Sequence, residues 1–371
     1  MRILVTSGYS YWGAFLPTEV RNPESKMQLG GGETAMINIA RELATLGNQV
    51  VVLHDIARFG TYEGVDYLPS RLFADLVTQW EHDVLVSWDS PQAFRLCDRS
   101  KLHVMAYQLN DTQVGVLDHA IDLYFHPSQW HADRYASLYP EISRVKQRYP
   151  ITNGIDPIRY AQEVQRRPYS VIHSSSPDRG LHHLLRMWTR IKELEPKATL
   201  DVYYDTKKWL DLVQDLIHRG YYVNTGDRAQ RLMDFMKAFS TWDSGVTFHG
   251  GVGQWKLAHA QLASSVMVYP CDPVQPTEGF SMSCLEGITA GCYLVTSTAD
   301  ALSELWSSAP NTCLLPPPTD NCALDDVWIE TIVSKLRLGT QSEGQVPRLN
   351  GDYVWRAIAV RWIEEFRHAL G

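Results

Sequence analysis

Long apolar runs are missing from this sequence of 371 residues, because no stretch approaches the ~20 residues needed to cross a bilayer. The apolar run at Met1 to Thr6 is also too short for a signal peptide. Six cysteines are present without a C-x-x-C pair, which fits reduced thiols. We therefore expect no transmembrane segment and a cytoplasmic location.

Metal-binding patterns and excess positive charge are missing too. The chain has no D-x-D pair, and its histidine and cysteine spacings match no zinc template, so we expect no bound metal. Lysine and arginine number 34 against 42 acidic residues, a formal charge of 34 − 42 = −8. This charge opposes binding to a nucleic-acid backbone.

Apolar strand-like runs alternate with segments of helical spacing along the whole chain. The alternation predicts an α/β fold with parallel sheets covered by helices, and ligands bind outside the carboxyl ends of such strands. With 44% hydrophobic residues the chain is long enough for two cores. The expected strands are 2–6, 49–53, 84–87, 104–107 and 123–125, then 169–173, 199–203, 246–248, 266–269 and 293–296.

A turn-rich segment at 153–157 marks the expected junction between two domains. The predicted domains are 1–157 and 158–350. Residues 351–371 show helical spacing and are expected to form a closing helix that packs back on the first domain.

The segment 278–286 carries Glu278 and Glu286 with seven residues between them. It follows a strand-like run and leads into apolar positions before Gly291, which predicts strand, loop and short helix. Gly279 lets backbone approach a ligand closely, and the N–H groups of a first helical turn suit a diphosphate. Because carboxylates nearby could bind sugar hydroxyls, the segment indicates a sugar-nucleotide site.

The same segment has a second interpretation. Ser283 and Glu286 have the spacing of a capping box, in which Glu286 would answer a backbone N–H group and Glu278 would be solvated. Under this hypothesis neither glutamate binds a ligand.

Several short motifs occur in one order over most of the chain, and together they resemble the retaining glycosyltransferases of family 4, which have the GT-B fold. The resemblance implies two Rossmann-like domains facing across a cleft, with the nucleotide-sugar donor bound by the second domain and the acceptor by the first. The motifs are Gly30-Gly31-Gly32-Glu33, Asn153-Gly154-Ile155-Asp156, Pro177-Asp178-Arg179-Gly180-Leu181, Phe248-His249-Gly250 and the two-glutamate segment with Gly287 and Gly291.

The resemblance also implies roles for single residues. Glu286 would bind the nucleotide ribose and Glu278 the donor sugar, while Arg179 would contact the diphosphate, where charge accumulates as the glycosidic bond breaks. Arg179 could instead only pair with Asp178 in a turn. The other implied donor contacts are the backbone of Gly31 and Gly32 from the first domain, the backbone of Gly279, Phe280, Ser281 and Met282, and a base pocket lined by His249, Gly250, Gly251 and Gly253.

This sequence departs from the family pattern in two places. Many relatives carry a second basic residue five or six positions before the equivalent of Arg179, but this chain has His173-Ser174-Ser175-Ser176 there. Phosphate binding would then depend on Arg179, on the serine hydroxyls of this run, Ser174 among them, and on Lys256. Many relatives also have a catalytic histidine where this chain has Asn110 and Asp111, which either take its place or form a turn.

The resemblance implies metal-independent transfer of a sugar, with retention, from a nucleotide-diphosphate-sugar co-substrate to an acceptor hydroxyl, and no other cofactor. The expected catalytic residues are Glu278, Arg179, Asn110 and Asp111. The acceptor (a glycan, a lipid-linked acceptor, a small molecule or a modified polymer) and the oligomeric state stay open. The alternatives are a nucleotide-sugar 2-epimerase of GT-B fold and a non-catalytic nucleotide-sugar-binding protein.

Overall fold

The computed structural model describes residues 1–7, 14–96, 99–110, 115–151, 153–218, 226–239, 244–272, 278–339 and 351–371. The chain forms two compact units. Unit 1 consists of Met1–Asn22, Leu29–Asp156 and Asn350–Gly371, and unit 2 consists of Pro23–Gln28 and Pro157–Leu349.

Unit 1 contains a sheet whose described strands follow the order β3-β4-β2-β1-β5-β6-β7-β8. All neighbouring strands are parallel except β3 and β4. The strands are β1 (Arg2–Ser7), β2 (Gln49–Leu53), β3 (Gly60–Tyr62), β4 (Val65–Leu68), β5 (Val84–Trp88), β6 (Leu102–Ala106), β7 (Leu123–Phe125) and β8 (Gln147–Arg148). The α-helices are α1 (Gly31–Thr45), α2 (Phe73–Gln79), α3 (Gln129–Leu138) and α11 (Trp355–Leu370), and short 3-10 turns occur at Pro17–Val20, Ser70–Leu72, Pro91–Arg95, Asp118–Ala120, Arg144–Lys146 and Gly351–Tyr353.

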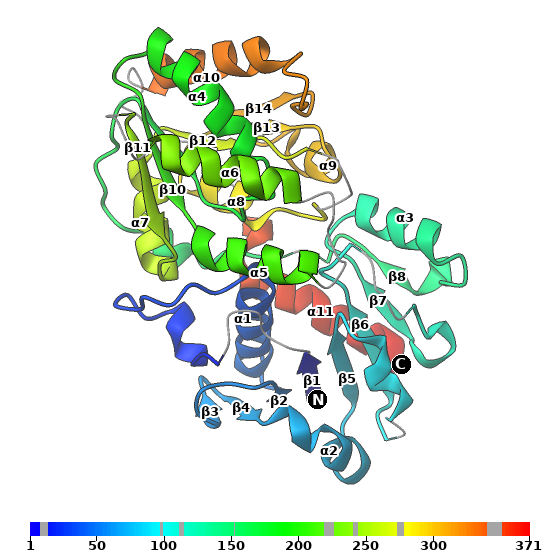
Figure 1. Ribbon diagram of the computed structural model, residues 1–371. Helices are drawn as coiled ribbons and strands as arrows, with labels where there is room; N and C mark the ends of the chain where they lie inside the picture. The colour runs from blue at the N-terminus through cyan, green and yellow to red at the C-terminus, as the bar shows by residue number, and fades with distance from the viewer. Residues whose placement is uncertain are drawn as a thin grey trace. The chain divides into compact units, whose positions relative to one another are not determined.

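The last helix, α11, is part of the core of unit 1 and lies beside α1 (Figure 1). Its apolar residues recur at helical spacing and are buried, among them Ile358, Trp362 and Phe366. The Trp362 ring meets the ring of Phe125 in β7 edge-on, at 4.9 Å between centroids. Arg148 of β8 donates a hydrogen bond of 2.6 Å to Glu365.

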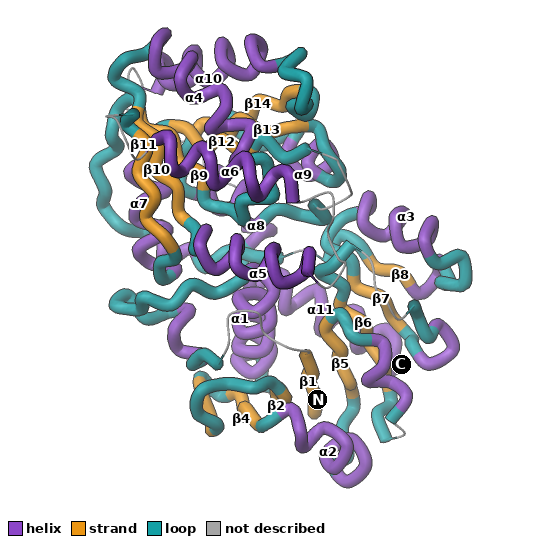
Figure 2. Tube along the Cα trace, viewed as in Figure 1, coloured by secondary structure: helices purple, strands orange, loops and turns teal. Residues whose placement is uncertain are grey.

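Unit 2 contains a parallel sheet in the order β11-β10-β9-β12-β13-β14, with helices on both sides of it (Figure 2). The strands are β9 (Ser170–His173), β10 (Thr199–Tyr203), β11 (Val246–Gly250), β12 (Val266–Tyr269), β13 (Tyr293–Ser297) and β14 (Thr312–Leu315). The helices are α4 (Leu181–Leu194), α5 (Thr206–His218), α6 (Gly226–Phe239), α7 (Gln254–Ala263), α8 (Met282–Thr289), α9 (Leu302–Trp306) and α10 (Asp325–Gly339), with a 3-10 turn at Pro157–Tyr160.

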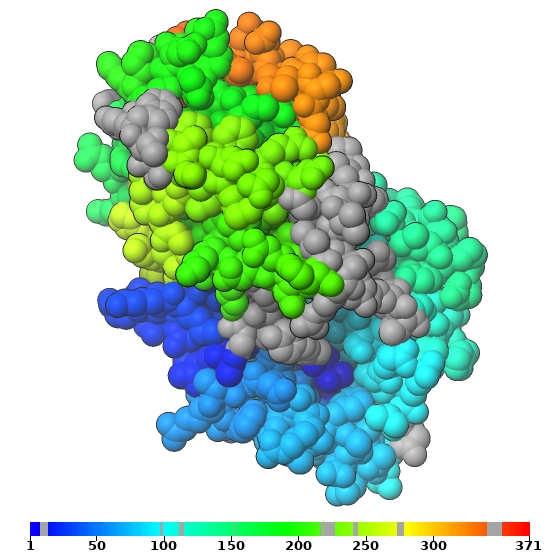
Figure 3. Space-filling view, in the orientation of Figure 1, coloured from blue at the N-terminus to red at the C-terminus, as the bar shows by residue number. Residues whose placement is uncertain are grey.

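Helix α4 packs on the sheet of unit 2 through a stripe of apolar residues. The residues of this stripe follow helical spacing and are all fully buried. They are Leu181, Leu184, Leu185, Trp188 and Ile191. In Figure 3 the orange segment that leads into α10 lies beside the green surface of α4 and α6. Ion pairs join these elements, from Arg186 of α4 to Asp325 and from Arg231 of α6 to Asp320.

The predicted α/β architecture with two parallel sheets is confirmed, and each predicted strand is present with bounds shifted by no more than two residues. The strands β3, β4, β8 and β14 were not predicted, because each is short and lies at or next to a sheet edge. The first helix begins at Gly31, within the glycine motif. Within the described residues, every helix is too short or too polar to cross a membrane.

Gly180 sets how closely α4 approaches strand β12. It has φ +89°, and a Cβ atom there would lie 1.9 Å from the carbonyl oxygen of Pro270. We expect Gly180→Ala to destabilise unit 2 by about 1–3 kcal/mol more than Gly250→Ala. Gly250 is the matched control, since it has φ +72° but open space at the Cβ position, so that only the left-handed backbone cost of about 1–2 kcal/mol applies. Thermal and urea unfolding of both variants measure the difference; equal losses would contradict the close approach.

Candidate functional site

The carboxyl ends of the unit 2 strands bring most of the predicted donor residues to one edge of the sheet. The loop 174–180 follows β9, the loop 251–253 follows β11, and Glu278 to Ser281 precede α8 after β12. Because all these strands are parallel, the loops emerge at the same edge, where ligands of such sheets bind.

Glu278 is buried and contacts residues from three elements of this edge. Its carboxylate accepts a hydrogen bond from the Tyr269 hydroxyl, and Arg179 Nε lies 3.4 Å from Glu278 Oε2. The Arg179 guanidinium also pairs with Asp178. The backbone N–H of Glu278 donates to Asp300 at 3.0 Å. The structure therefore joins Arg179 with Glu278, and it also contains the Arg179–Asp178 pair that a turn would use.

Glu286 belongs to a second buried network. Gln261 of α7 donates hydrogen bonds to Glu286 Oε2 at 3.1 Å and to the Ser174 hydroxyl at 3.2 Å. Arg159 is fully buried, with Nη2 3.9 Å from Glu286 Oε1. Within the described residues, Arg159 Nε and Nη2 make no hydrogen bond. A guanidinium beside the carboxylate favours its charged form.

The capping-box interpretation is wrong. The N-cap of α8 is Ser281, whose hydroxyl accepts a hydrogen bond from the backbone N–H of Cys284 at 3.2 Å. Glu286 lies beyond the first turn of this helix, so its carboxylate does not cap it. Ser281 has φ 71°, a backbone conformation that side chains rarely adopt.

Burial dominates the electrostatics of both glutamates. It raises the pKa of Glu278, although Arg179 and the Tyr269 hydroxyl act in the opposite direction. Burial also raises the pKa of Glu286, against Arg159 and Gln261. For Arg179, burial acts to lower the pKa, but the carboxylates of Asp178 and Glu278 outweigh it and raise that pKa. Arg179 is therefore a permanent positive charge at this edge.

The other predicted residues near Glu278, at positions 279–282, are largely buried. Phe280 packs edge-on against Trp306, and its carbonyl oxygen accepts a hydrogen bond of 3.2 Å from the Trp306 indole. Gly279 is buried and Met282 partly exposed. The side chain of Lys256 is exposed on α7.

His249 is held by neighbouring strand residues. Its Nε2 lies 2.5 Å from Asp201, and its ring stacks on Tyr203 at 4.2 Å with the planes 2° apart. The space at the nearby glycines is occupied by the segment 23–28, because a Cβ atom at Gly253 would lie 2.0 Å from the carbonyl oxygen of Ser25. Gly251 is similarly close to Gln28. These two glycines thus make room for protein backbone and side chain, which was not predicted.

The predicted residues of unit 1 lie at two places. Gly31 and Gly32 form the start of α1 after the N-cap Gly30. Asn110 follows β6, and its Oδ1 is buried without a hydrogen-bond partner among the described residues. Asp111 lies outside the described residues. The loop before Asn110 is braced by Asp89, whose Oδ1 accepts hydrogen bonds from the N–H groups of Gln108 and Leu109 at 2.7 and 3.0 Å.

Asp89 was missed from the sequence. It directly follows β5, has φ 57°, and burial raises its pKa to about 6. Arg159, Gln261 and Tyr269 were missed as well. Their only sequence signal is position, since Arg159 follows the junction motif and Tyr269 ends a predicted strand.

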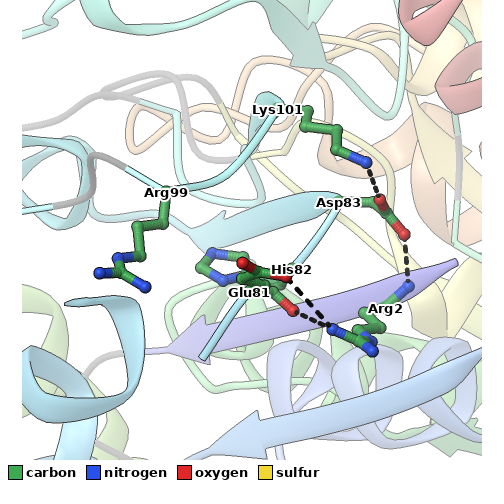
Figure 4. Close-up of a pocket in the computed structure, with 6 residues that line it drawn as sticks. All are labelled: Arg2, Glu81, His82, Asp83, Arg99 and Lys101. Atoms are coloured by element: carbon green, nitrogen blue, oxygen red, sulfur yellow. Dashed lines mark hydrogen bonds and ion pairs between the residues drawn. The ribbon is translucent and has the colours of Figure 1, made fainter. Parts of the chain in front are cut away.

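A cavity of about 590 Å³ lies elsewhere in unit 1 (Figure 4). Charged side chains line it, including Arg2, Asp83 and Lys101, and the Lys101–Asp83 pair is 2.8 Å long. These residues stand at the amino ends of β1, β5 and β6. Since ligands of doubly wound sheets bind at the carboxyl ends, this cavity is not the candidate site.

Comparisons with known proteins identify the fold. No protein-family model and no curated protein matches the sequence. Solved structures of GT-B glycosyltransferase type do match over nearly the whole chain, and this protein has their fold.

AviGT4, a glycosyltransferase involved in avilamycin A biosynthesis, is 13% identical with a TM-score of 0.64, covering 99% of this chain and 98% of that one. Sucrose-phosphate synthase from Thermosynechococcus elongatus is 14% identical with a TM-score of 0.62, covering 99% of both chains. HepE from Anabaena in complex with UDP is 16% identical with a TM-score of 0.61, covering 99% of this chain and all of that one. HepE is also known in complex with UDP-glucose.

The raised pKa of Glu286 predicts how Glu286→Gln changes stability with pH. A carboxyl group with a raised folded-state pKa binds more protons in the folded than in the unfolded protein, so its contribution to stability falls as pH rises above its ordinary pKa of 4.5. Glutamine removes this loss. Between about pH 4 and about pH 8, the melting temperature of the variant minus that of the wild type should increase. A decrease would show that Arg159 lowers the pKa of Glu286.

Proposed function

We propose that this protein is a retaining glycosyltransferase related to family 4, which transfers a sugar from a nucleotide-diphosphate-sugar to an acceptor hydroxyl. The observation that carries the proposal is the edge of unit 2 at the carboxyl ends of the parallel strands, where Arg179 and Glu278 lie on loops and Glu286 lies on α8. The fold supports it, and so does the presence of UDP and UDP-glucose in complexes of a structural neighbour. Because these neighbours are glycosyltransferases, neither the 2-epimerase nor the non-catalytic binding protein is favoured.

Glu286 is proposed to bind the ribose of the nucleotide. Gln261 and Arg159 fix its carboxylate from the protein side, so that its orientation is set before a ligand arrives. An ionised carboxylate accepts hydrogen bonds from two neighbouring hydroxyls, which a ribose offers. The hydroxyl of Ser174 accepts a hydrogen bond from the same Gln261 side chain. Ser174 lies on the loop that leads to Arg179.

Arg179 is proposed to stabilise the departing diphosphate, and Glu278 to hold hydroxyls of the donor sugar. A fixed positive charge is most useful where negative charge develops in the transition state, and Arg179 needs no metal to provide it. Retention follows if the acceptor hydroxyl attacks from the face that the diphosphate leaves and passes its proton to a phosphate oxygen. In this scheme no carboxylate acts as a nucleophile, and the nucleotide-sugar is the only co-substrate besides the acceptor.

The roles of the two glutamates are separable by substitution. Glu286→Gln should weaken UDP binding by about ten- to hundredfold, because a hydrogen bond to a charged group contributes roughly 1.5–3 kcal/mol. Glu278→Gln should mainly lower the transfer rate and leave UDP affinity nearly unchanged, since its partner is the sugar. UDP titration calorimetry and assays of donor turnover measure both effects.

Glu330→Gln on α10 is the control for these variants, because Glu330 is exposed and the substitution changes the charge of unit 2 equally. Melting temperatures separate binding from folding. If both glutamate variants bound UDP and turned over donor like the control but melted lower, the two carboxylates would be structural and the proposal would fail.

Metal independence is tested by chelation. Because Arg179 supplies the positive charge, excess EDTA should leave the initial rate of transfer nearly unchanged. Loss of the rate in EDTA, with recovery on adding magnesium or manganese, would mean that a metal assists the departure of the diphosphate.

A further inference from the structure

Two histidines and an aspartate of unit 2 converge at the start of α4. His182 and His183 are buried in the first turn of α4, and Asp320 lies half-exposed between β14 and α10. One nitrogen of each histidine and one oxygen of Asp320 lie within 4.8 Å of one another. His182 Nε2 is 3.8 Å from Asp320 Oδ1, and the two imidazole rings are 3.9 Å apart at their centroids.

The tautomer of His183 follows from its neighbour Asp272. His183 Nε2 lies 3.0 Å from Asp272 Oδ2, and Arg228 donates to both carboxylate oxygens. A carboxylate that accepts two hydrogen bonds from an arginine is an acceptor for its other neighbours too, so His183 Nε2 donates to Asp272. In a neutral imidazole whose Nε2 carries the hydrogen, Nδ1 carries a lone pair.

His182 contributes a second buried nitrogen. Its Nε2 and His183 Nδ1 both lack a hydrogen-bond partner among the described residues, although the two side chains are almost completely buried. Neutral imidazole is the form that binds metal ions.

We propose that His182, His183 and Asp320 bind a divalent first-row transition metal of the zinc type. Two imidazoles and one carboxylate are ligands that Zn²⁺ takes, whereas Mg²⁺ and Ca²⁺ prefer oxygen alone. The Asp272–His183 hydrogen bond matches the carboxylate–histidine arrangement that orients metal-binding imidazoles. Ligands about 2 Å from a tetrahedral ion lie roughly 3.3 Å apart, so a small movement of the Asp320 side chain closes the site.

The ion pair of Asp320 with Arg231 does not prevent this movement. Its side chains are 49% and 39% exposed, and exposed pairs contribute little to stability. Bound metal would instead fix the segment before α10 to α4. Arg186 already links the same elements, since it donates to Asp325 and to the carbonyl oxygen of Thr319 at 3.0 Å. The proposed role is structural, and its test does not depend on the proposed transfer reaction.

Calorimetry and absorption spectroscopy test this site on the untagged full chain after treatment with EDTA and removal of the chelator. Zn²⁺ should bind at one ion per chain, Co²⁺ should give the visible absorption of a four-coordinate ion, and Mg²⁺ should not compete. Zn²⁺ should also raise the melting temperature with concentration.

Asp320→Ala is the decisive variant, because Asp320 is exposed enough to be replaced without disturbing the fold. Its Zn²⁺ affinity should fall by at least the roughly 10- to 100-fold that loss of an outer-shell partner costs. The Zn²⁺ affinity of His182→Ala should be lower still. His368→Ala, which removes an exposed histidine of α11, should bind Zn²⁺ like the wild type. Absence of one-to-one binding, or wild-type affinity in both Asp320→Ala and His182→Ala, would overturn the proposal whatever the transferase assays show.

Discussion

The buried carboxylate of Glu286 sets the packing of three segments of unit 2. A charge removed from water costs several kcal/mol unless partners compensate it. Here Arg159 comes from the 3-10 turn after the junction, Gln261 from α7, and Tyr160 donates to Gln261 at 2.8 Å. A shift of either helix by one residue would separate these partners. The candidate site and the packing of unit 2 therefore depend on the same contacts.

Glu278 depends on other elements than Glu286. Its partners are Tyr269 at the end of β12, Arg179 before α4 and Asp300 after β13. Among the described contacts the two networks share no residue. The two carboxylates are therefore held by separate sets of partners.

The sequence predicted the parts of this protein that repeat a simple pattern. Buried parallel strands such as 266–269 form apolar runs in the sequence, and their bounds were nearly right. β8 has only two residues and lacks a pattern of its own. The segment 278–286 was predicted as part of the site because two carboxylates and a glycine follow a strand. Arg159, Gln261 and Asp89 were not predicted, because each contacts residues that are distant in sequence. The periodicity of a sequence carries no information about such contacts.

The path of the chain also constrains the order in which the protein folds. Unit 2 includes residues 23–28, which lie close against Gly251 and Gly253. Unit 1 includes α11 near the end of the chain. During synthesis α11 is therefore made only after the residues of unit 2, so unit 1 lacks its last helix until then. The early segment of unit 2, residues 23–28, has already been made when the rest of unit 2 is synthesised. Although unit 1 begins first in the sequence, unit 2 is the one that can be completed first.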